Sequence, residues 1–150
     1  RGGYSVVHKG VRLHDRRLVA VKKIDIFEMA QKKRDRCLQE VSLLRSLNHP
    51  NIISMIDAFI EESTLIIVFE WAMAGDLKRA LRRQAEHRRL LEEPAVWGHF
   101  HQIIGALHYM HENRVMHRDV KPANILMTAT GLKVGDLGLG RHFSTQTEAA

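Results

Sequence analysis

The chain has 150 residues, a length that suits one domain with its own buried core. Hydrophobic residues make up 45% and charged residues 27%, and this average composition excludes wholesale disorder. The 23 Lys and Arg residues outnumber the 17 Asp and Glu residues, which gives a net charge of +6. Because the basic residues are scattered among acids, solvated helix faces are favoured over a nucleic-acid site.

Cysteine and membrane-type patterns point to a reducing compartment and away from a membrane. Cys37 is the only cysteine, which excludes an intramolecular disulfide and a thiolate metal cluster, and we expect a buried, inert thiol. No apolar run approaches the ~20 residues of a membrane span, and the N-terminus does not read as a signal peptide. The chain begins without Met, so we expect it to be a piece of a longer protein.

The first part of the chain predicts strands and one helix. The predicted strands lie at 1–10, around a glycine-bearing turn, and at 19–24, 52–59 and 64–70. A helix is expected from about residue 28 to residue 47, because Cys37, Val41 and Leu44 recur at helical spacing. Pro50 then ends the helical pattern.

The second part predicts mainly helices. Asp76 is an N-cap candidate for a basic helix to about Arg89, and Pro94 is placed to start a longer helix to about Glu112. The apolar stripe of the longer helix comprises Trp97, Phe100, Ile103, Ile104, Leu107 and Met110. Short strands follow at 125–127 and 132–134. This order predicts an α+β fold in two lobes, with a ligand cleft between them.

One short segment, residues 117–124, carries a mixture of side chains that a space-filling loop would not need: His-Arg-Asp-Val-Lys-Pro-Ala-Asn. We interpret Asp119 as the base that orients an attacking hydroxyl, Lys121 as a cation beside it, and Asn124 as an amide ligand of Mg²⁺. Asp136, which follows the strand at 132–134, is the second candidate metal ligand. A solvated polar loop is the alternative interpretation.

Lys22 is the candidate cation for the phosphates of a nucleotide, because it closes an apolar strand. Glu40 lies close to the buried stripe of the predicted helix and needs a cationic partner, for which Lys22 is the obvious choice. Lys23 competes for that role, but strand alternation points it to the other face. A strand-end lysine that extends to water is the alternative.

Two weaker signals concern phosphate and metal. Gly2 belongs to a partial glycine-rich pattern that would cover the phosphates, although an ordinary hairpin turn explains it equally well. The ten histidines include His108 and His111, three apart on a predicted helix. No H-E-x-x-H motif or cysteine cluster supports them, so no structural metal site is expected.

In combination and order, these motifs resemble those of eukaryotic protein kinases over the whole chain. The residues that carry the resemblance are 19–22, Glu40, 49–51, 117–124 and 136–138. Lys121, two residues after Asp119, resembles the serine/threonine type. The resemblance implies a bilobal fold, with an antiparallel sheet and one helix in an N-lobe at 1–70, a hinge at 71–75, and the start of a helical C-lobe through the early activation segment at 76–150.

The resemblance also implies ATP and Mg²⁺ as cofactors, protein substrates, an activating kinase or partner protein, and neither nucleic acid nor membrane as a partner. Lys22 and Glu40 would anchor the phosphates. The adenine would lie at a hinge of Glu70, Trp71 and Ala72, with Phe69 as gatekeeper, near Gly2, Val7, Ala20 and Leu126. A regulatory spine would comprise Leu44, Met55, His117 and Leu137. Arg118 would meet an activation-loop phosphate.

A narrower resemblance is to the NimA-related mitotic kinases. It is carried by residues 74–77, 115–119, 121–124, 128–131 and 135–141, and by Leu137, where most kinases have phenylalanine. It implies phosphorylation of serine and threonine in cell-cycle proteins, in the cytoplasm or nucleus, at the spindle or centrosome. A non-catalytic pseudokinase or scaffold is one alternative. An inactive fragment is the other, because the chain begins inside the glycine loop and ends before an A-P-E segment.

Overall fold

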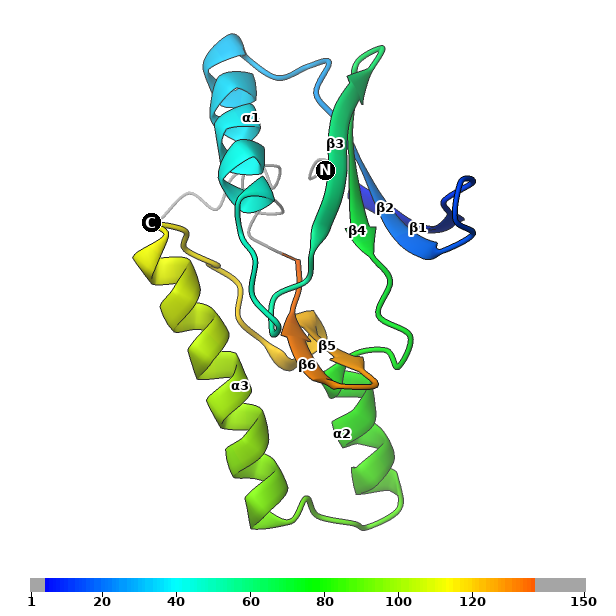
Figure 1. Cartoon of the computed structure of the whole chain (residues 1–150), viewed down its shortest axis with the longest axis vertical. Coiled ribbons are helices and arrows are strands. Elements are labelled where there is room, and N and C mark those ends of the chain that lie inside the picture. The colour runs from blue at the N-terminus through cyan, green and yellow to red at the C-terminus, as the bar shows by residue number, and fades with distance from the viewer. Residues whose placement is uncertain (1–4, 137–150) are drawn as a thin grey trace, which may run out of the picture. The chain divides into compact units, whose positions relative to one another are not determined.

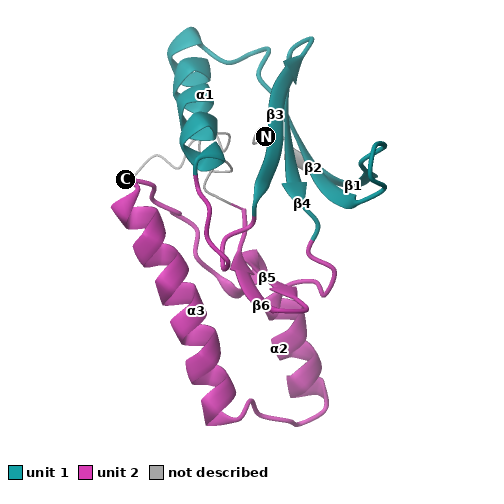
Figure 2. Ribbon diagram, in the orientation of Figure 1, with its two compact units in different colours: residues 1–46, 54–71, 138–150 teal, residues 47–53, 72–137 magenta. Residues whose placement is uncertain are grey.

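The computed structural model describes residues 5–136, which form helices and antiparallel strands in two compact units. Unit 1 contains residues 5–46 and 54–71, and unit 2 contains residues 47–53 and 72–136; Figure 2 colours them teal and magenta. The fold is therefore α+β, as predicted, with its strands mainly in the first unit and its helices mainly in the second (Figure 1).

Unit 1 is a four-stranded antiparallel sheet with one helix. The strand order is β1-β2-β4-β3. The elements are β1 (Ser5–Val11), β2 (Leu18–Asp25), α1 (Gln31–Arg45), β3 (Met55–Glu61) and β4 (Thr64–Glu70). The central strands β2 and β4 carry three almost fully buried side chains, Ile24, Leu65 and Ile67. Burial of each contributes roughly 1.5–3 kcal/mol relative to an exposed position.

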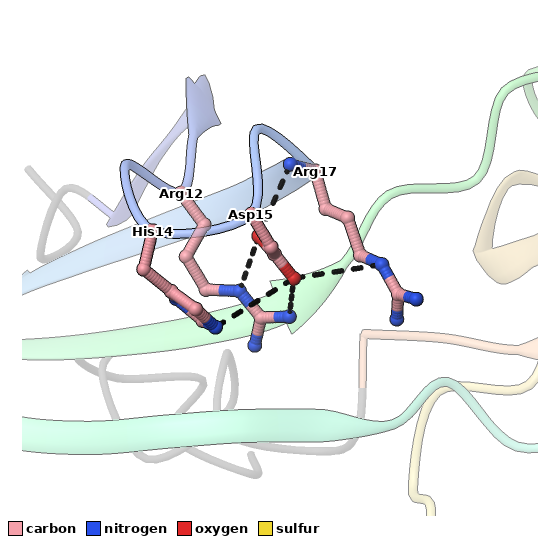
Figure 3. A network of polar contacts seen from close by, with 4 residues as sticks. All are labelled: Arg12, His14, Asp15 and Arg17. Atoms are coloured by element: carbon pink, nitrogen blue, oxygen red, sulfur yellow. Dashed lines mark hydrogen bonds and ion pairs between the residues drawn. The ribbon is translucent and has the colours of Figure 1, made fainter.

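The turn between β1 and β2 is held by the carboxylate of Asp15 (Figure 3). Arg12 donates to both of its oxygens, and the Arg17 N–H donates to Oδ1 at 3.2 Å. The Nε atom of Arg17 and the Nε2 atom of His14 lie 3.5 and 3.9 Å from Oδ2. The hydrogen bonds from Arg12 hold the pKa of Asp15 well below its usual range.

Helix α1 confirms the predicted helical spacing, because Cys37, Val41 and Leu44 form its buried side. It is shorter than the predicted range and begins at Gln31. The Arg34 guanidinium holds the chain before the helix, because it donates a hydrogen bond of 3.0 Å to the Ile26 carbonyl. Burial, and then the charge of Glu40, raise the pKa of the Cys37 thiol to about 11, as expected for an inert cysteine.

Unit 2 contains the remaining elements: α2 (Leu77–Glu86), α3 (Glu93–Glu112), the 3₁₀ turn η1 (Pro122–Asn124), β5 (Ile125–Thr128) and β6 (Gly131–Val134). Strands β5 and β6 form an antiparallel hairpin. Helix α3 packs against β6, and α2 packs against η1 and β5. Asp76 caps α2 as predicted, because its side chain accepts a hydrogen bond of 2.8 Å from the Arg79 N–H.

Residues 47–53 depart from the predicted organisation. We expected a strand from residue 52, but β3 begins at Met55, and residues 47–53 belong to unit 2. The reason is pairing with β6: the Ile53 N–H donates to the Val134 carbonyl, and the Val134 N–H donates to the Asn51 carbonyl. Ile52 is buried and forms a parallel bridge with Val134.

The predicted apolar stripe of α3 is only partly buried. Ala106 and Met110 are buried, whereas Trp97, Phe100 and Ile104 are exposed in the part of the chain that the structure describes. Trp97 and Phe100 contact each other edge to face, with ring centroids 5.9 Å apart. Between residues 5 and 136, no helix is long and apolar enough to cross a membrane.

Candidate active site

Asp119 and Lys121 lie in the loop that joins α3 to η1, within unit 2. The Lys121 ammonium is 2.7 Å from Asp119 Oδ2. Both side chains retain solvent access, at 51% for Lys121 and 30% for Asp119, so the pair contributes little to stability. The arrangement instead leaves a carboxylate accessible to a ligand with a cation directly beside it, as the sequence interpretation requires.

Asn124 fixes the position of Asp119. Its Nδ2 donates to the Asp119 carbonyl at 2.8 Å and to Asp119 Oδ2 at 3.0 Å. Asn124 is 7% exposed, so its rotamer is held by packing as well as by these bonds. Because both amide hydrogens are directed to Asp119, the amide oxygen is the atom that remains to coordinate a metal ion.

His117 joins the loop to the segment after β6. It is buried, its Nε2 lies 2.8 Å from the Gly135 carbonyl, and its Nδ1 accepts from the Asp119 N–H at 3.2 Å. A carbonyl only accepts and an N–H only donates, so the proton must be on Nε2 and the imidazole must be neutral. His117 thus orients the backbone of Asp119 within unit 2; the predicted spine role stays a prediction.

Asp136 is brought next to Asn124 by the backbone. The Gly135 N–H donates to the Asn124 carbonyl at 2.8 Å, and Asp136 follows immediately. A Cβ at Gly135 would lie 2.8 Å from Leu126 Cδ1, so only glycine fits here without moving Leu126. Asp136 has a positive φ of 49° and Arg118 one of 66°, a conformation that costs a non-glycine residue roughly 1–2 kcal/mol and that clusters at functional sites.

The oxygen donors of this loop suit Mg²⁺. Magnesium prefers hard oxygen ligands and is commonly held by one or two carboxylates, with phosphates and water completing its shell. Asn124, the last residue of η1, would supply an amide oxygen, and Asp136, two residues after β6, would supply a carboxylate. No group of three or more His, Cys, Asp or Glu side chains within residues 5–136 is arranged to hold a metal ion.

Unit 1 places the predicted nucleotide-contacting residues of its sheet on one face. Val7 pairs with Lys22 in the register of β1 and β2, and Ala20 pairs with Phe69 in the register of β2 and β4. Side chains opposite each other in a ladder, or two apart along a strand, lie on the same face. Val7, Ala20, Lys22 and Phe69 therefore share a face, and so does Met55, which pairs with Phe69.

Lys22 and Lys23 differ as strand alternation predicts. Lys22 is only 5% exposed, whereas Lys23 is exposed. A lysine that is buried to this degree needs a counter-charge. Glu40, the predicted partner, lies in α1 directly before the buried Val41, and its charge acts on the Cys37 thiol. The Lys22–Glu40 ion pair itself stays a prediction.

The predicted hinge residues are divided between the units, with Glu70 and Trp71 in unit 1 and Ala72 in unit 2. Glu70 and Ser54 form a reciprocal pair: the Glu70 N–H donates to the Ser54 carbonyl at 3.0 Å, and the Ser54 N–H donates to the Glu70 carboxylate at 2.8 Å. Lys9 lies over the Trp71 ring, 5.4 Å from its centroid. In unit 2, residue 76 bridges to Leu126 of β5.

Two predicted site residues, Gly2 and Leu137, lie outside the described residues. Of the other predicted spine members, Leu44 is buried in α1 and Met55 is half-buried at the start of β3. Sequence reasoning missed a supporting group, Gln102 on α3, which bonds to both Asn51 and Leu132. The sequence did contain a signal for this group, because Gln102 is a polar side chain beside Ile103 in an otherwise apolar stretch of the helix.

The chain is similar in sequence to known proteins over both units. A family model described as "Protein kinase domain" matches residues 1–150. The chain is 38% identical to serine/threonine-protein kinase srb10 of Schizosaccharomyces pombe, over 93% of this chain and 41% of that protein. It is 34% identical to serine/threonine-protein kinase 36 of Pongo abelii, over 97% of this chain and 11% of that protein.

The chain therefore spans less than half the length of these relatives. The family match extends over the whole chain, including the loop at 117–124, the buried Lys22 and helix α1. The chain belongs to the protein kinase domain family.

Proposed function

We propose that the protein that contains this chain transfers the γ-phosphoryl group of ATP to serine or threonine hydroxyls of protein substrates. The observation that carries the proposal is the arrangement around Asp119, in which Asn124 holds the carboxylate and Lys121 neutralises it. Phosphoryl transfer depends mainly on positioning and charge neutralisation, and this loop supplies both with short, directed contacts.

Each residue has a defined task in this proposal. Asp119 accepts a hydrogen bond from the substrate hydroxyl, which orients the oxygen and receives its proton. Lys121 stabilises the negative charge that develops nearby. Asn124 and Asp136 would hold Mg²⁺, which when bound neutralises the phosphate oxygens. Lys22, with Glu40 as its partner, would bind the phosphates, and Val7, Ala20, Glu70, Ala72 and Leu126 the adenosine.

We further propose that the protein is a NimA-related kinase that acts in the cell cycle, in the cytoplasm or nucleus. Support comes only from the sequence motifs at 74–77, 115–119, 121–124, 128–131 and 135–141. The two relatives named above are not described as NimA-related. An activating kinase or partner protein would act on the activation segment, and Arg118 would meet a phosphate on that segment. Tagged full-length protein should concentrate at the spindle or centrosome of dividing cells; uniform distribution throughout mitosis would contradict this assignment.

The catalytic proposal is tested by Asp119→Asn in the full-length protein, with transfer from MgATP to a serine- or threonine-containing protein substrate as the measurement. We expect kcat to fall by about 100-fold or more, because a positioned base contributes roughly 10²–10⁴ in rate. The affinity for MgATP should change by less than about threefold, because the proposed nucleotide contacts are made by other residues.

Glu112→Gln is the matched control, since Glu112 is an exposed carboxylate at the end of α3 and its loss changes the charge equally. It should retain wild-type turnover. Turnover of Asp119→Asn at the wild-type rate would refute the role of Asp119. Binding of MgATP without any transfer by the wild-type protein would favour a pseudokinase instead.

A further inference from the structure

Helix α2 carries a basic surface that the catalytic proposal does not use. We define the α2 basic face as Lys78, Arg79, Arg82 and Arg83, extended past the helix end by Arg88 and Arg89. Lys78 and Arg82 are one helical turn apart, as are Arg79 and Arg83, so the four share one side of the helix. All six side chains are exposed.

The opposite side of α2 faces the protein. Leu77, Ala80 and Gln84 are partly buried, and α2 packs against η1 and β5. η1 and β5 are the elements that contain Asn124 and Leu126, so α2 is anchored to the chain segment directly after the catalytic loop. The α2 basic face therefore lies on a helix that packs against neighbouring elements, and not on a loop.

The charges of this face are not explained by neutralisation within the described chain. Arg82 pairs with Glu86 at 3.0 Å, whereas the other five form no ion pair with any residue between 5 and 136. The helix dipole favours Arg83, which lies in the last turn, but it does not account for Lys78 and Arg79. Lys78 and Arg79 lie in the first turn, which contains no acidic residue, and cations at a helix N-terminus oppose the dipole.

The chemistry of the face fits an acidic polypeptide better than a nucleic acid. An arginine guanidinium can donate two parallel hydrogen bonds to one carboxylate, and five of the six residues are arginine. Leu90, which follows Arg89, is 93% exposed and would contact an apolar side chain of a protein partner. Single-stranded nucleic acids bind on aromatic platforms, and residues 72–96 contain no Phe, Tyr or Trp.

We propose that the α2 basic face docks an acidic, leucine-containing stretch of a protein substrate. This inference rests on the proposed function in one respect: it takes the protein that carries the acidic stretch to be a substrate of the kinase. Binding through the face needs no nucleotide and no transfer step, so the two proposals are tested by different measurements.

The direct test is fluorescence anisotropy with a fluorescein-labelled peptide of repeated Glu-Glu-Leu, added to the full-length protein without ATP. The Arg79→Gln/Arg83→Gln double variant should raise the Kd by about fivefold or more, because two exposed charge pairs are lost. A peptide of repeated Gln-Gln-Leu should bind at least about tenfold more weakly than the acidic one to the wild-type protein.

Lys32→Gln/Arg36→Gln is the matched control, since it removes the same charge from two exposed residues one turn apart on α1. Its Kd should change by less than about twofold. Equal weakening by both double variants would reduce the effect to net charge and overturn the proposal. Tighter binding of a single-stranded oligonucleotide of the same charge would overturn the choice of a protein partner.

The kinetic test joins the peptide to a phosphorylatable serine segment. The Arg79→Gln/Arg83→Gln variant should raise KM with kcat unchanged, because docking contacts are made equally in the ground and transition states. A fall in kcat with unchanged KM would contradict docking. Intact peptide binding without any phosphoryl transfer would refute the proposed function while supporting the docking face.

Discussion

The side-chain oxygen of Gln102 accepts a hydrogen bond of 2.7 Å from the backbone N–H of Leu132. The same oxygen accepts from Asn51 Nδ2 at 3.1 Å, and Nδ2 also donates to the Leu132 carbonyl at 2.8 Å. Gln102 thereby joins α3, the loop at 47–53 and β6. Because β6 leads directly to Asp136, the predicted metal ligand is positioned by this network as well as by the catalytic loop.

Replacement of Gln102 by leucine should destabilise the protein. The variant keeps a similar volume but removes the acceptor of two partly buried donors, which costs about 1–3 kcal/mol. Urea denaturation of wild type and variant measures this difference. Gln102→Glu is the control, because a carboxylate still accepts from both donors and should recover most of the loss. A free energy of unfolding for Gln102→Leu within about 0.5 kcal/mol of wild type would show that the network is not stabilising.

Replacement of Asn124 by aspartate should impair catalysis without a change in side-chain size. The variant removes both hydrogen bonds to Asp119 and sets a second carboxylate at the position that is now 3.0 Å from Oδ2. Repulsion should raise the pKa of one member of the pair and shift Asp119. We expect kcat to fall by roughly 10- to 100-fold, the usual effect of losing a positioning contact.

Steady-state phosphorylation assays at several Mg²⁺ concentrations provide the measurement for Asn124→Asp. Asn48→Asp introduces the same charge at an exposed asparagine of unit 2 and should leave kcat near wild type. If both variants lose activity equally, the effect belongs to added negative charge and not to the contact with Asp119.

Cys37 should resist alkylation in the folded protein. Its pKa of about 11, raised chiefly by burial, leaves roughly a hundredfold less thiolate at pH 8 than an ordinary cysteine has. As the only cysteine, it reports unfolding by itself: iodoacetamide labelling followed by mass spectrometry should be slow in buffer and fast in urea. Rapid labelling in buffer would contradict a buried thiol.

The raised pKa of Cys37 also predicts a pH dependence of stability. The folded state holds the thiol proton more tightly than the unfolded state, so this contribution is complete below about pH 8.5 and is lost as pH rises toward about 11. Cys37→Ala should lack that part of the alkaline destabilisation. An identical slope for wild type and variant between these pH values would exclude the thiol as its source.

Asp15→Asn should loosen the turn between β1 and β2. The carboxylate accepts from Arg12 and from the Arg17 N–H, and the neutral amide cannot replace the charge-assisted bonds (Figure 3). Hydrogen exchange at the Arg12 and Arg16 amides should become faster at pH 7. Asp25→Asn is the control, since Asp25 accepts from the Phe27 N–H in a different loop.

The wild-type turn should itself respond to acid. The lowered pKa of Asp15 means that its stabilisation is present above about pH 4, the ordinary range of an aspartate, and is lost as pH falls below that value. Asp15→Asn should show no such change at the turn. A wild-type turn whose exchange protection is independent of pH in this range would show that the Arg12–Asp15 contact is not what holds it.

Residue order alone determined the parts of the site that are local. The spacing of Asp119, Lys121 and Asn124 specifies their contacts, because a short loop with a 3₁₀ turn brings them within hydrogen-bond distance of one another. Strand alternation likewise separated the buried Lys22 from the exposed Lys23. These relationships depend on residues that are only a few positions apart. Their spacing can therefore be recognised directly in the sequence.

Only the tertiary structure decided which distant segments hold the site in place. A strand was expected from residue 52, yet Ile53 and Asn51 bond to the backbone of Val134, and Asn51 Nδ2 donates to the Leu132 carbonyl, 81 residues away. The apolar spacing of α3 likewise did not reveal that Trp97 and Phe100 would be exposed in the described part of the chain while Ala106 is buried. Periodicity marks which residues can share a face; the partner that covers the face is chosen by packing and by the pairing of backbone groups.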